Sequence, residues 1–387
     1  MSSMDLRLDT SGDYYARKFQ PTKREDTLIL NMGPQHPSTH GVLRILLEIE
    51  GEYILRADPV LGYVHRMHEK MGEVMSYPQY YPNPPRTDYL HALAWNWAHV
   101  AAVERLMGIE VPERAEYIRV ITCELNRITS HLLWWGAYLL DLGAFTPIMY
   151  SFDDRERIQD ILQRITGSRL TYCYYRFGGV SDDIDDRFVE DTRRHCAVMK
   201  ERFKMFKSLV TDNFILRKRV EEIGEIPLET CRKYGATGPV LRGSGKAYDV
   251  RRAEPYSVYD RFDFNIPAYD TCDAMGRYLV RMDEMQESIK IIEQALDTLP
   301  EGDYIHPKAP KRPKPPVGDI YFALEGARGK IGIHLVSDGG KSPYRIKLRA
   351  PGYSNLSLFS EVAQGTLISD AVSILGSLDL VIPEIDR

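Results

Sequence analysis

The chain has 387 residues and a net charge of −5, with 27% charged and 43% hydrophobic residues, so it can bury one large core or two smaller ones. This balance argues against nucleic acid as the main partner, because no basic face is paired with an RNA- or DNA-binding motif. No apolar run reaches the roughly 18–20 residues that cross a bilayer, and the first residues lack a signal-peptide core, so we expect a protein that stays on the cytoplasmic side.

The N-terminal part is predicted to be a flexible tail over 1–26, followed by a β-rich segment over 27–66. Strands are expected over 27–30, 42–50 and 53–56, because apolar and polar residues alternate there. In the second strand the predicted apolar face holds Leu43, Ile45, Leu47 and Ile49, and the polar face Arg44, Glu48 and Glu50.

The segment 31–41, between the first two predicted strands, carries two histidines four residues apart, His36 and His40, in a loop stiffened by Pro34 and Pro37. A tight strand-to-strand loop rarely needs two histidines for its shape. Two imidazoles suit a site at which something must be hydrogen-bonded and protonated. The alternative is that one histidine caps the turn and the other is solvated.

The middle of the chain, 67–304, is predicted to be a helical bundle. Its strongest helix follows Pro112 and ends at Gly143, since apolar residues there recur every three or four positions. A second helix is expected within 182–218, with a solvated lysine and arginine face, and a third over 270–298. In the helix that follows Pro112, the apolar stripe consists of Ile118, Ile121, Leu125, Ile128, Leu132, Trp135, Leu139 and Leu142.

A proline-rich connector over 305–318 precedes a C-terminal α/β segment over 319–387. That segment is expected to begin with a hairpin of strands at 320–324 and 331–336. The chain is therefore predicted to be an α+β protein, predominantly α, in which a central bundle of long helices is joined by small β-rich segments from both ends.

The cysteines predict no metal site, because the five are scattered and form no Cys-x-x-Cys pair. We expect small buried hydrophobes and no iron–sulfur cluster ligated by this chain. Direct NAD or ATP binding is also not expected, since the sequence has no Gly-x-Gly-x-x-Gly, P-loop or His-Glu-x-x-His motif. The five are Cys123, Cys173, Cys196, Cys231 and Cys272.

Tyr89 is a candidate for chemistry because it follows the proline-rich stretch 82–85 at the expected start of a helix. Thr87 or Asp88 would cap that helix. A tyrosine in the first turn, just past a stiff loop, can present its hydroxyl to a cavity. The alternative is a packed aromatic, of which a chain with 24 tyrosines has many.

Asp141 lies in the last turn of the strongest helix, where the macrodipole disfavours a carboxylate unless a cation or a strong donor is beside it. A protonated histidine from the early loop is a plausible partner, and an exposed aspartate is the alternative. Glu124 and Arg127, three residues apart on one helix, are interpreted simply as an intrahelical pair. The local sequence leaves three roles open for Arg66 and Arg86: they bind a phosphate or carboxylate, they are surface charges, or they tune the electrostatics of a redox centre.

Several motifs, taken together and in order, resemble the 49 kDa, D-type subunit of respiratory complex I (NADH-quinone oxidoreductase). The resemblance runs from about residue 27 to the last residue. Its motifs are 31–41, Gly62-Tyr63-Val64-His65-Arg66, Glu69-Lys70, Asp88-Tyr89, 119–134, Phe177-Gly178-Gly179-Val180, 238–245, Ser337-Asp338-Gly339, Arg349-Ala350-Pro351-Gly352, Ser377-Leu378-Asp379 and Glu384-Ile385-Asp386-Arg387.

The resemblance implies a fold like the large subunit of nickel–iron hydrogenases, without the cysteines that bind nickel there, so hydrogenase activity is excluded. It implies that Tyr89 and His40 hydrogen-bond the two carbonyl oxygens of a quinone, that Asp141 is the carboxylate partner of that histidine, and that His36 lies in the same loop. Our hypothesis is that Tyr89 and His40 also supply the protons. Quinone, ubiquinone or menaquinone, would be the substrate. The subunit would be inactive alone.

The same resemblance implies partners. Arg66 and Arg86 would lie near the terminal iron–sulfur cluster, which a neighbouring subunit holds. FMN would also sit in a partner. The chain would contact the cluster-bearing subunit, the C-type peripheral subunit and the membrane subunit at the quinone tunnel, on the cytoplasmic side of the inner membrane, and help to couple quinone reduction to proton translocation.

The chain departs from the family pattern in places. Thr171 stands where the family has a histidine near the cluster, so we expect a weaker pH dependence of the cluster's potential. Met67-His68, Lys330 and Pro383 are also atypical, which leaves the cavity shape and the quinone type open. Two alternative functions remain at this point: the equivalent subunit of a ferredoxin- or F420-driven quinone or phenazine oxidoreductase, and a non-catalytic scaffold.

Overall fold

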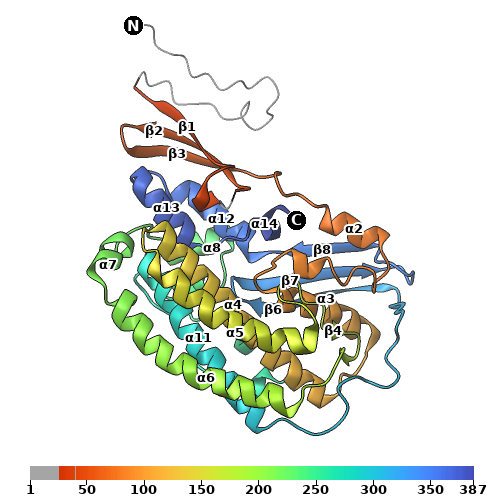
Figure 1. The fold of residues 1–387 in the computed structure, drawn as a ribbon. Helices are drawn as coiled ribbons and strands as arrows, with labels where there is room; N and C mark the ends of the chain where they lie inside the picture. Colours follow the sequence, from red (N-terminus) through yellow and green to blue (C-terminus); the bar gives the residue numbers. More distant parts are fainter. Residues whose placement is uncertain (1–25, 40) are drawn as a thin grey trace.

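A computed structural model of the chain, which describes residues 26–39 and 41–387, places short sheets around a body of long helices (Figure 1). The predicted α+β, predominantly helical class is confirmed. The strands are β1 (Leu28–Met32), β2 (Arg44–Glu50), β3 (Tyr53–Val60), β4 (Tyr175–Arg176), β5 (Gly179–Val180), β6 (Gly318–Gly326), β7 (Gly329–Ser337) and β8 (Arg345–Arg349). The longer helices are α3 (Ala92–Met107), α4 (Glu113–Asp141), α5 (Thr146–Thr166), α6 (Asp186–Phe206), α11 (Ala274–Asp297), α12 (Pro351–Val362) and α13 (Ile368–Ser377). The shorter helices are α2 (His68–Val74), α7 (Phe214–Val220), α8 (Leu228–Tyr234), α9 (Pro239–Arg242), α10 (Val250–Ala253) and α14 (Ile382–Asp386), with single 3₁₀ turns at Pro37–Thr39, Pro84–Arg86 and Tyr259–Arg261.

The centre of the helical body is α4, whose predicted extent is confirmed. It begins after Pro112, carries Glu113 and Glu116 in its first turn, and is buried along most of its length. It ends where Gly143 adopts a positive φ of 94° and donates its N–H to the carbonyl of Leu140 at 2.9 Å. Helices α5 and α11 lie alongside α4, and α6 packs against α5 and α11 (Figure 1).

The other predicted helices are also present, within modified limits. The helix expected within 182–218 is α6, capped by Asp185, which accepts the N–H of Phe188 at 2.7 Å. A π-helical turn over Lys207–Thr211 ends it, and α7 follows. The helix expected over 270–298 is α11.

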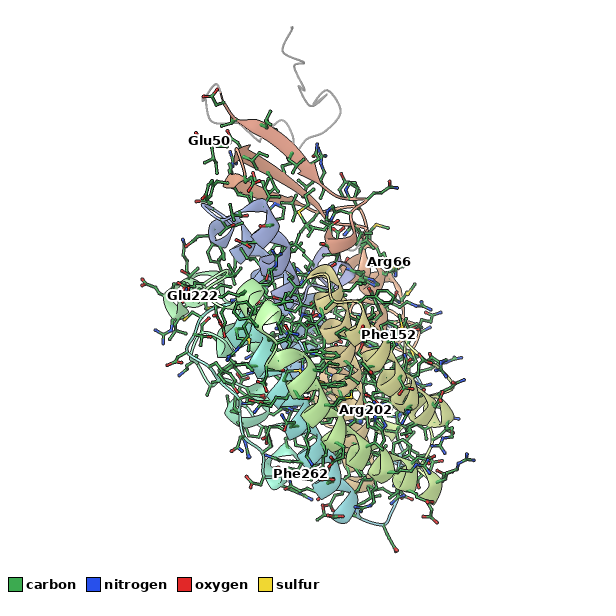
Figure 2. All side chains as sticks on the ribbon, turned by 60° about the vertical axis from the view of Figure 1, so that its left-hand side comes forward. Glu50, Arg66, Phe152, Arg202, Glu222 and Phe262 are labelled. Atoms are coloured by element: carbon green, nitrogen blue, oxygen red, sulfur yellow. The ribbon has the colours of Figure 1, made fainter. Side chains whose placement is uncertain are left out.

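The N-terminal sheet is antiparallel in the order β1-β2-β3 and packs on the C-terminal helices α12 and α13 (Figure 1). Its apolar face shares one hydrophobic cluster with those helices, which contains Ile45 and Leu47 of the sheet and Leu358 and Ile374 of the helices. Segments from the two ends of the chain are therefore held together. In Figure 2, Glu50 marks the outer end of this sheet and Phe262 the opposite end of the molecule.

The C-terminal sheet is antiparallel in the order β6-β7-β8, and α3 packs on it. The predicted hairpin is confirmed: Gly326 pairs with Gly329, so Ala327 and Arg328 form a two-residue turn. This turn is unusual because it is buried, with Ala327 and Arg328 at 0% and 1% exposure. The hairpin tip thus projects into the protein rather than into solvent.

Two sequence-based expectations about local structure are wrong. Glu48 does not lie on a polar face of β2; it is fully buried, because β2 is the middle strand and Glu48 lies between Ile29 and Arg56 of the neighbouring strands. No helix begins at Asp88: α3 starts at Ala92, and residues 87–91 form turns instead. Among the described residues, no helix is both long enough and apolar enough to span a bilayer.

Candidate functional site

A cavity of about 230 Å³ lies where four distant parts of the chain meet. These are the end of α4, the turn before α3, the segment around the start of α14, and the N-terminal segment with Val42 and Val64. Both Tyr89 and Asp141 line it, so the structure brings these two predicted site residues together. The other lining residues are Val42, Val64, Leu90, Leu133, Trp134, Ala137, Tyr138, Gly376, Asp379, Leu380, Val381, Ile382 and Pro383.

Tyr89 lies in the turn that precedes α3 and is 36% exposed. The backbone of this turn is fixed by Asp88, whose Oδ1 accepts the N–H groups of Leu90 at 3.1 Å and His91 at 3.2 Å. Burial raises the pKa of Tyr89, while the nearby Arg328 guanidinium opposes the rise. The phenol is therefore protonated at neutral pH and able to donate a hydrogen bond into the cavity.

Asp141 is the last residue of α4, at the rim of the cavity. Its Oδ1 accepts a long hydrogen bond of 3.4 Å from the hydroxyl of Ser38. Ser38 lies in the segment 31–41, which we call the histidine loop. This loop is therefore packed against the end of the helix. Gly33 permits the two ends of this loop to approach closely, because a Cβ atom there would collide with the carbonyl oxygen of Leu43.

Of the two histidines in this loop, the structure describes only His36. The Nδ1 atom of His36 accepts the backbone N–H of Ser38 at 3.2 Å, which is the turn-capping role that the sequence left open. His36 is not among the described residues that line the cavity. His40 lies outside the described residues; Val42, two positions further on, lines the cavity.

Beneath Tyr89 lies a buried ion cluster that sequence reasoning missed. Arg328, at the hairpin tip, donates to Asp88 at 2.8 Å, to Asp379 at 3.1 Å and to the hydroxyl of Ser130 at 3.2 Å. Asp379 also lines the cavity. The only sequence signal is that Asp88 and Asp379 both fall within the family motifs, whereas nothing in the sequence distinguishes Arg328 from the residues of an ordinary turn.

Glu384, in α14, completes this cluster. It is fully buried, and its Oε2 accepts the N–H of Gly352 at 3.3 Å. Burial, followed by the negative charge of Asp88, raises the pKa of Glu384 to about 8. The carboxyl group is therefore mostly protonated at neutral pH, unlike an ordinary glutamate.

The residues predicted for the electron-input side, Arg66 and Arg86, do not line this cavity. Arg66 and Arg86 are both exposed, and Figure 2 shows Arg66 near the junction of the N-terminal sheet with the body. Both arginines lie close to the buried His68: burial first, and then the charges of Arg66, His65 and Arg86, lower the pKa of His68 to about 4. Thr171 is half-buried, two residues before Cys173, whose thiol also feels the charge of Arg86.

Glu124 and Arg127 form the predicted intrahelical pair, at 3.0 Å between Oε2 and Nε. They belong to a larger network, because Arg251, Tyr259 and Ser288 also donate to Glu124. In the part of the chain that the structure describes, no three histidine, cysteine or carboxylate side chains are grouped to hold a metal ion. Of the cysteines, three are buried and Cys173 and Cys272 are half-buried.

Comparison with known proteins gives one consistent answer. The family model for the respiratory-chain NADH dehydrogenase 49 kDa subunit matches residues 141–315 and 308–387. The D-type subunit of NADH-quinone oxidoreductase from Desulfotalea psychrophila is 61% identical over 363 residues, covering 94% of this chain and 98% of that protein. The corresponding protein from Opitutus terrae is 59% identical over 380 residues, covering 98% and 95%. That from Geobacillus thermodenitrificans is 46% identical over 363 residues, covering 94% and 99%.

Proposed function

The chain belongs to the family of the 49 kDa subunit of respiratory-chain NADH dehydrogenase, and we propose that it forms the quinone-reducing end of such an enzyme. In this role it holds the quinone ring while electrons arrive from the terminal iron–sulfur cluster of a neighbouring subunit. It acts only as a subunit of NADH-quinone oxidoreductase, as its relatives are named.

The observation that carries this proposal is the shared cavity of Tyr89 and Asp141. These residues come from positions 52 apart in sequence, on either side of a cavity whose apolar walls suit an aromatic ring. The resemblance assigns the same two residues to quinone binding and to the partner of His40. The hydrogen bond from Ser38 attaches the histidine loop to Asp141, which supports the assignment of His40 as the partner of this carboxylate.

The chemistry requires donors at both ends of the ring. Two-electron reduction of a quinone places negative charge on both carbonyl oxygens, and holding such a charge unpaired in a buried site costs several kcal/mol. In our proposal the hydroxyl of Tyr89 donates to one oxygen and the imidazole of His40 to the other, and each passes on a proton as charge develops. Asp141 stabilises the protonated imidazole before the transfer.

In this proposal, quinone reduction is coupled to proton translocation through the loss of the positive charge on His40. Once His40 has given up its proton, the attraction that holds the histidine loop to Asp141 weakens. We propose that the resulting movement of the loop and of the end of α4 is the signal to the membrane subunits that translocate protons. The membrane subunit at the quinone tunnel would therefore dock beside Asp141.

The electron-input side is assigned to the surface around His68. Arg66 and Arg86 provide positive charge there, which would stabilise a reduced, more negative cluster in the partner subunit. Thr171 cannot titrate and His68 has a pKa of about 4, so neither side chain changes its charge near neutrality. We therefore expect the cluster's midpoint potential to vary little between pH 6 and 8, and a full pH slope in a redox titration would contradict this assignment.

The test of the main proposal is Tyr89→Phe in the assembled enzyme, with His40→Ala beside it. We expect NADH:quinone activity to fall roughly 100-fold in each variant, because each removes one proton donor. Electron transfer from NADH to a soluble acceptor that bypasses quinone should stay normal. The matched control is Tyr344→Phe, since this tyrosine is 68% exposed and does not line the cavity. Normal quinone turnover in both site variants would refute the proposal.

A further inference from the structure

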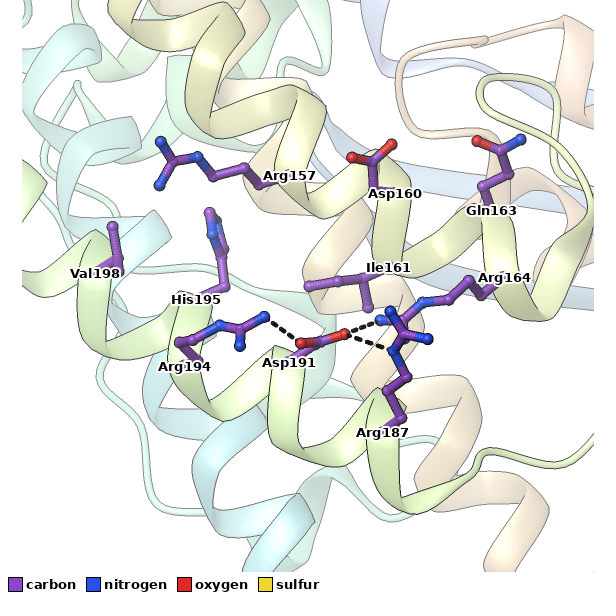
Figure 3. A pocket seen from close by; sticks show the side chains of 10 residues that line it. All are labelled: Arg157, Asp160, Ile161, Gln163, Arg164, Arg187, Asp191, Arg194, His195 and Val198. Carbon is purple, nitrogen blue, oxygen red and sulfur yellow. Dashed lines mark hydrogen bonds and ion pairs between the residues drawn. The ribbon is translucent and has the colours of Figure 1, made fainter.

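A second cavity, of about 740 Å³, lies between α5 and α6 and takes no part in the proposed function (Figure 3). Four arginines line it, two from each helix: Arg157 and Arg164 from α5, and Arg187 and Arg194 from α6. Of the described residues that line it, two are acidic, Asp160 and Asp191. The cavity therefore carries more positive than negative charge.

The two carboxylates do not neutralise this charge. Asp191 is shared by three guanidinium groups: Arg164 and Arg194 donate hydrogen bonds to it, and Arg187 lies 3.8 Å away (Figure 3). Asp160 is bound instead to Arg169, which does not line the cavity, at 2.7 Å. Three guanidiniums carry about fifteen N–H donors and one carboxylate accepts about four. Most donors at Asp191 remain available to an anion.

His195 supplies a second, independent indication of a ligand. It is only 6% exposed and lines the cavity, yet its Nε2 has no hydrogen-bond partner among the described residues. Figure 3 shows its ring pointing from α6 toward Arg157 of α5. Burial, and then the charge of Arg157, lowers the pKa of this ring to about 4, against an opposing contribution from Asp153. A neutral, buried imidazole without a partner is costly unless a ligand completes its hydrogen bonds.

The floor of the cavity is apolar, formed by Ile161 of α5 and Val198 of α6 (Figure 3). Although the sequence carries none of the common nucleotide-binding motifs, we propose that this cavity binds an organic phosphate of nucleotide size. The phosphate groups bind the arginines around Asp191 by forked hydrogen bonds. The organic ring lies on Ile161 and Val198 and hydrogen-bonds Nε2 of His195. The cavity volume falls in the range of roughly 300–1,000 Å³ that such ligands occupy.

The test uses the full chain and calorimetric titration with ADP and, separately, with inorganic phosphate. We expect saturable binding of ADP, at least tenfold tighter than phosphate because only ADP reaches the floor. The double variant Arg187→Gln, Arg194→Gln should weaken both ligands at least tenfold. His195→Ala should weaken ADP several-fold and leave phosphate unchanged, and thermal unfolding of each variant reports whether the fold is kept.

The matched control is Arg193→Gln. Arg193 is in the same helix, is exposed and pairs with Asp297, but it does not line the cavity. We expect its ADP affinity to equal that of the unmodified chain. Absence of saturable ADP binding, equal affinities for ADP and phosphate, or equal weakening in the control and the double variant would each overturn the proposal.

Discussion

Two groups of buried charges in this molecule differ in how they are balanced. The first lies inside the helical body, where Glu124 of α4 accepts hydrogen bonds from Arg127, Arg251, Tyr259 and Ser288. Burial alone would raise the pKa of Glu124, but the two arginines lower it to about 2. This carboxylate is therefore permanently ionised and fully paired.

The second group lies under the candidate quinone cavity. Arg328 is shared by Asp88 and Asp379, Arg281 lies 3.7 Å from Asp379, and among the described residues the partner of Glu384 is a backbone N–H rather than a guanidinium. Burial and the charge of Asp88 raise the pKa of Glu384 to about 8. Burial raises the pKa of both carboxyl groups; the two guanidiniums bonded to Glu124 reverse that rise, whereas none among the described residues is bonded to Glu384.

The largest effect is expected from disrupting the first group. Arg127→Met removes a cation and leaves Glu124 and Glu284 less compensated in a dry interior, so we expect a loss of about 3–5 kcal/mol in the free energy of unfolding, measured by urea denaturation. Arg193→Met, at an exposed ion pair with Asp297, should change it by about 0.5 kcal/mol or less. If both substitutions lowered the free energy of unfolding equally, burial would not determine the cost of removing one partner of an ion pair.

Sequence alone can predict the elements whose signal is local. The apolar stripe along α4 and the glycines that bound the β6–β7 turn decide those structures without help from the rest of the chain. The sequence pattern does not reveal helix α5, because its buried positions, such as Ile158 and Leu162, are separated by acidic and basic residues that mask the stripe.

The candidate site can be predicted only in part. Tyr89 and Asp141 are identified through the family resemblance, and Asp141 also through its awkward place at a helix end. The ion cluster is not, because Arg328 lies 240 residues from Asp88 in sequence and nothing local marks a turn residue as buried. Asp88 is expected from the sequence to cap a helix, but its Oδ1 accepts N–H groups in the turn before α3, and its Oδ2 binds Arg328. Long-range pairing of this kind is decided by tertiary packing.

Glu384→Gln probes the second group through its pH dependence. A folded-state pKa of about 8, above the unfolded value near 4.5, means that the folded chain binds a proton more tightly than the unfolded chain. The stabilising contribution is complete below the unfolded pKa and is lost as the pH rises through the folded pKa.

We therefore expect the free energy of unfolding of the unmodified chain to fall by on the order of 4 kcal/mol between pH 5 and pH 8.5 through this group. The Gln variant, which keeps the shape and cannot ionise, should show a flatter profile, as measured by urea denaturation at a series of pH values. Glu361→Gln is the control, since Glu361 is exposed and bound to Lys233, with a lowered pKa. Parallel profiles for the unmodified chain and the Glu384 variant would show that this carboxyl group is ionised throughout.

The smallest effect, and one that separates two explanations by its sign, is expected for Asp141→Asn. A carboxylate at the C-terminal end of α4 opposes the helix macrodipole, so its removal alone would stabilise the protein by about 0.3–1 kcal/mol. If Asp141 holds the protonated His40, as proposed, removal should instead destabilise at pH 6, and this loss should disappear by pH 8, where the imidazole is neutral. Asp186→Asn, in the first turn of α6, is the control: it should destabilise by a similar amount at both pH values, because the dipole favours that carboxylate. Stabilisation by Asp141→Asn at pH 6 would show that Asp141 does not pair with a protonated His40. Asp141 would then behave as an ordinary surface carboxylate.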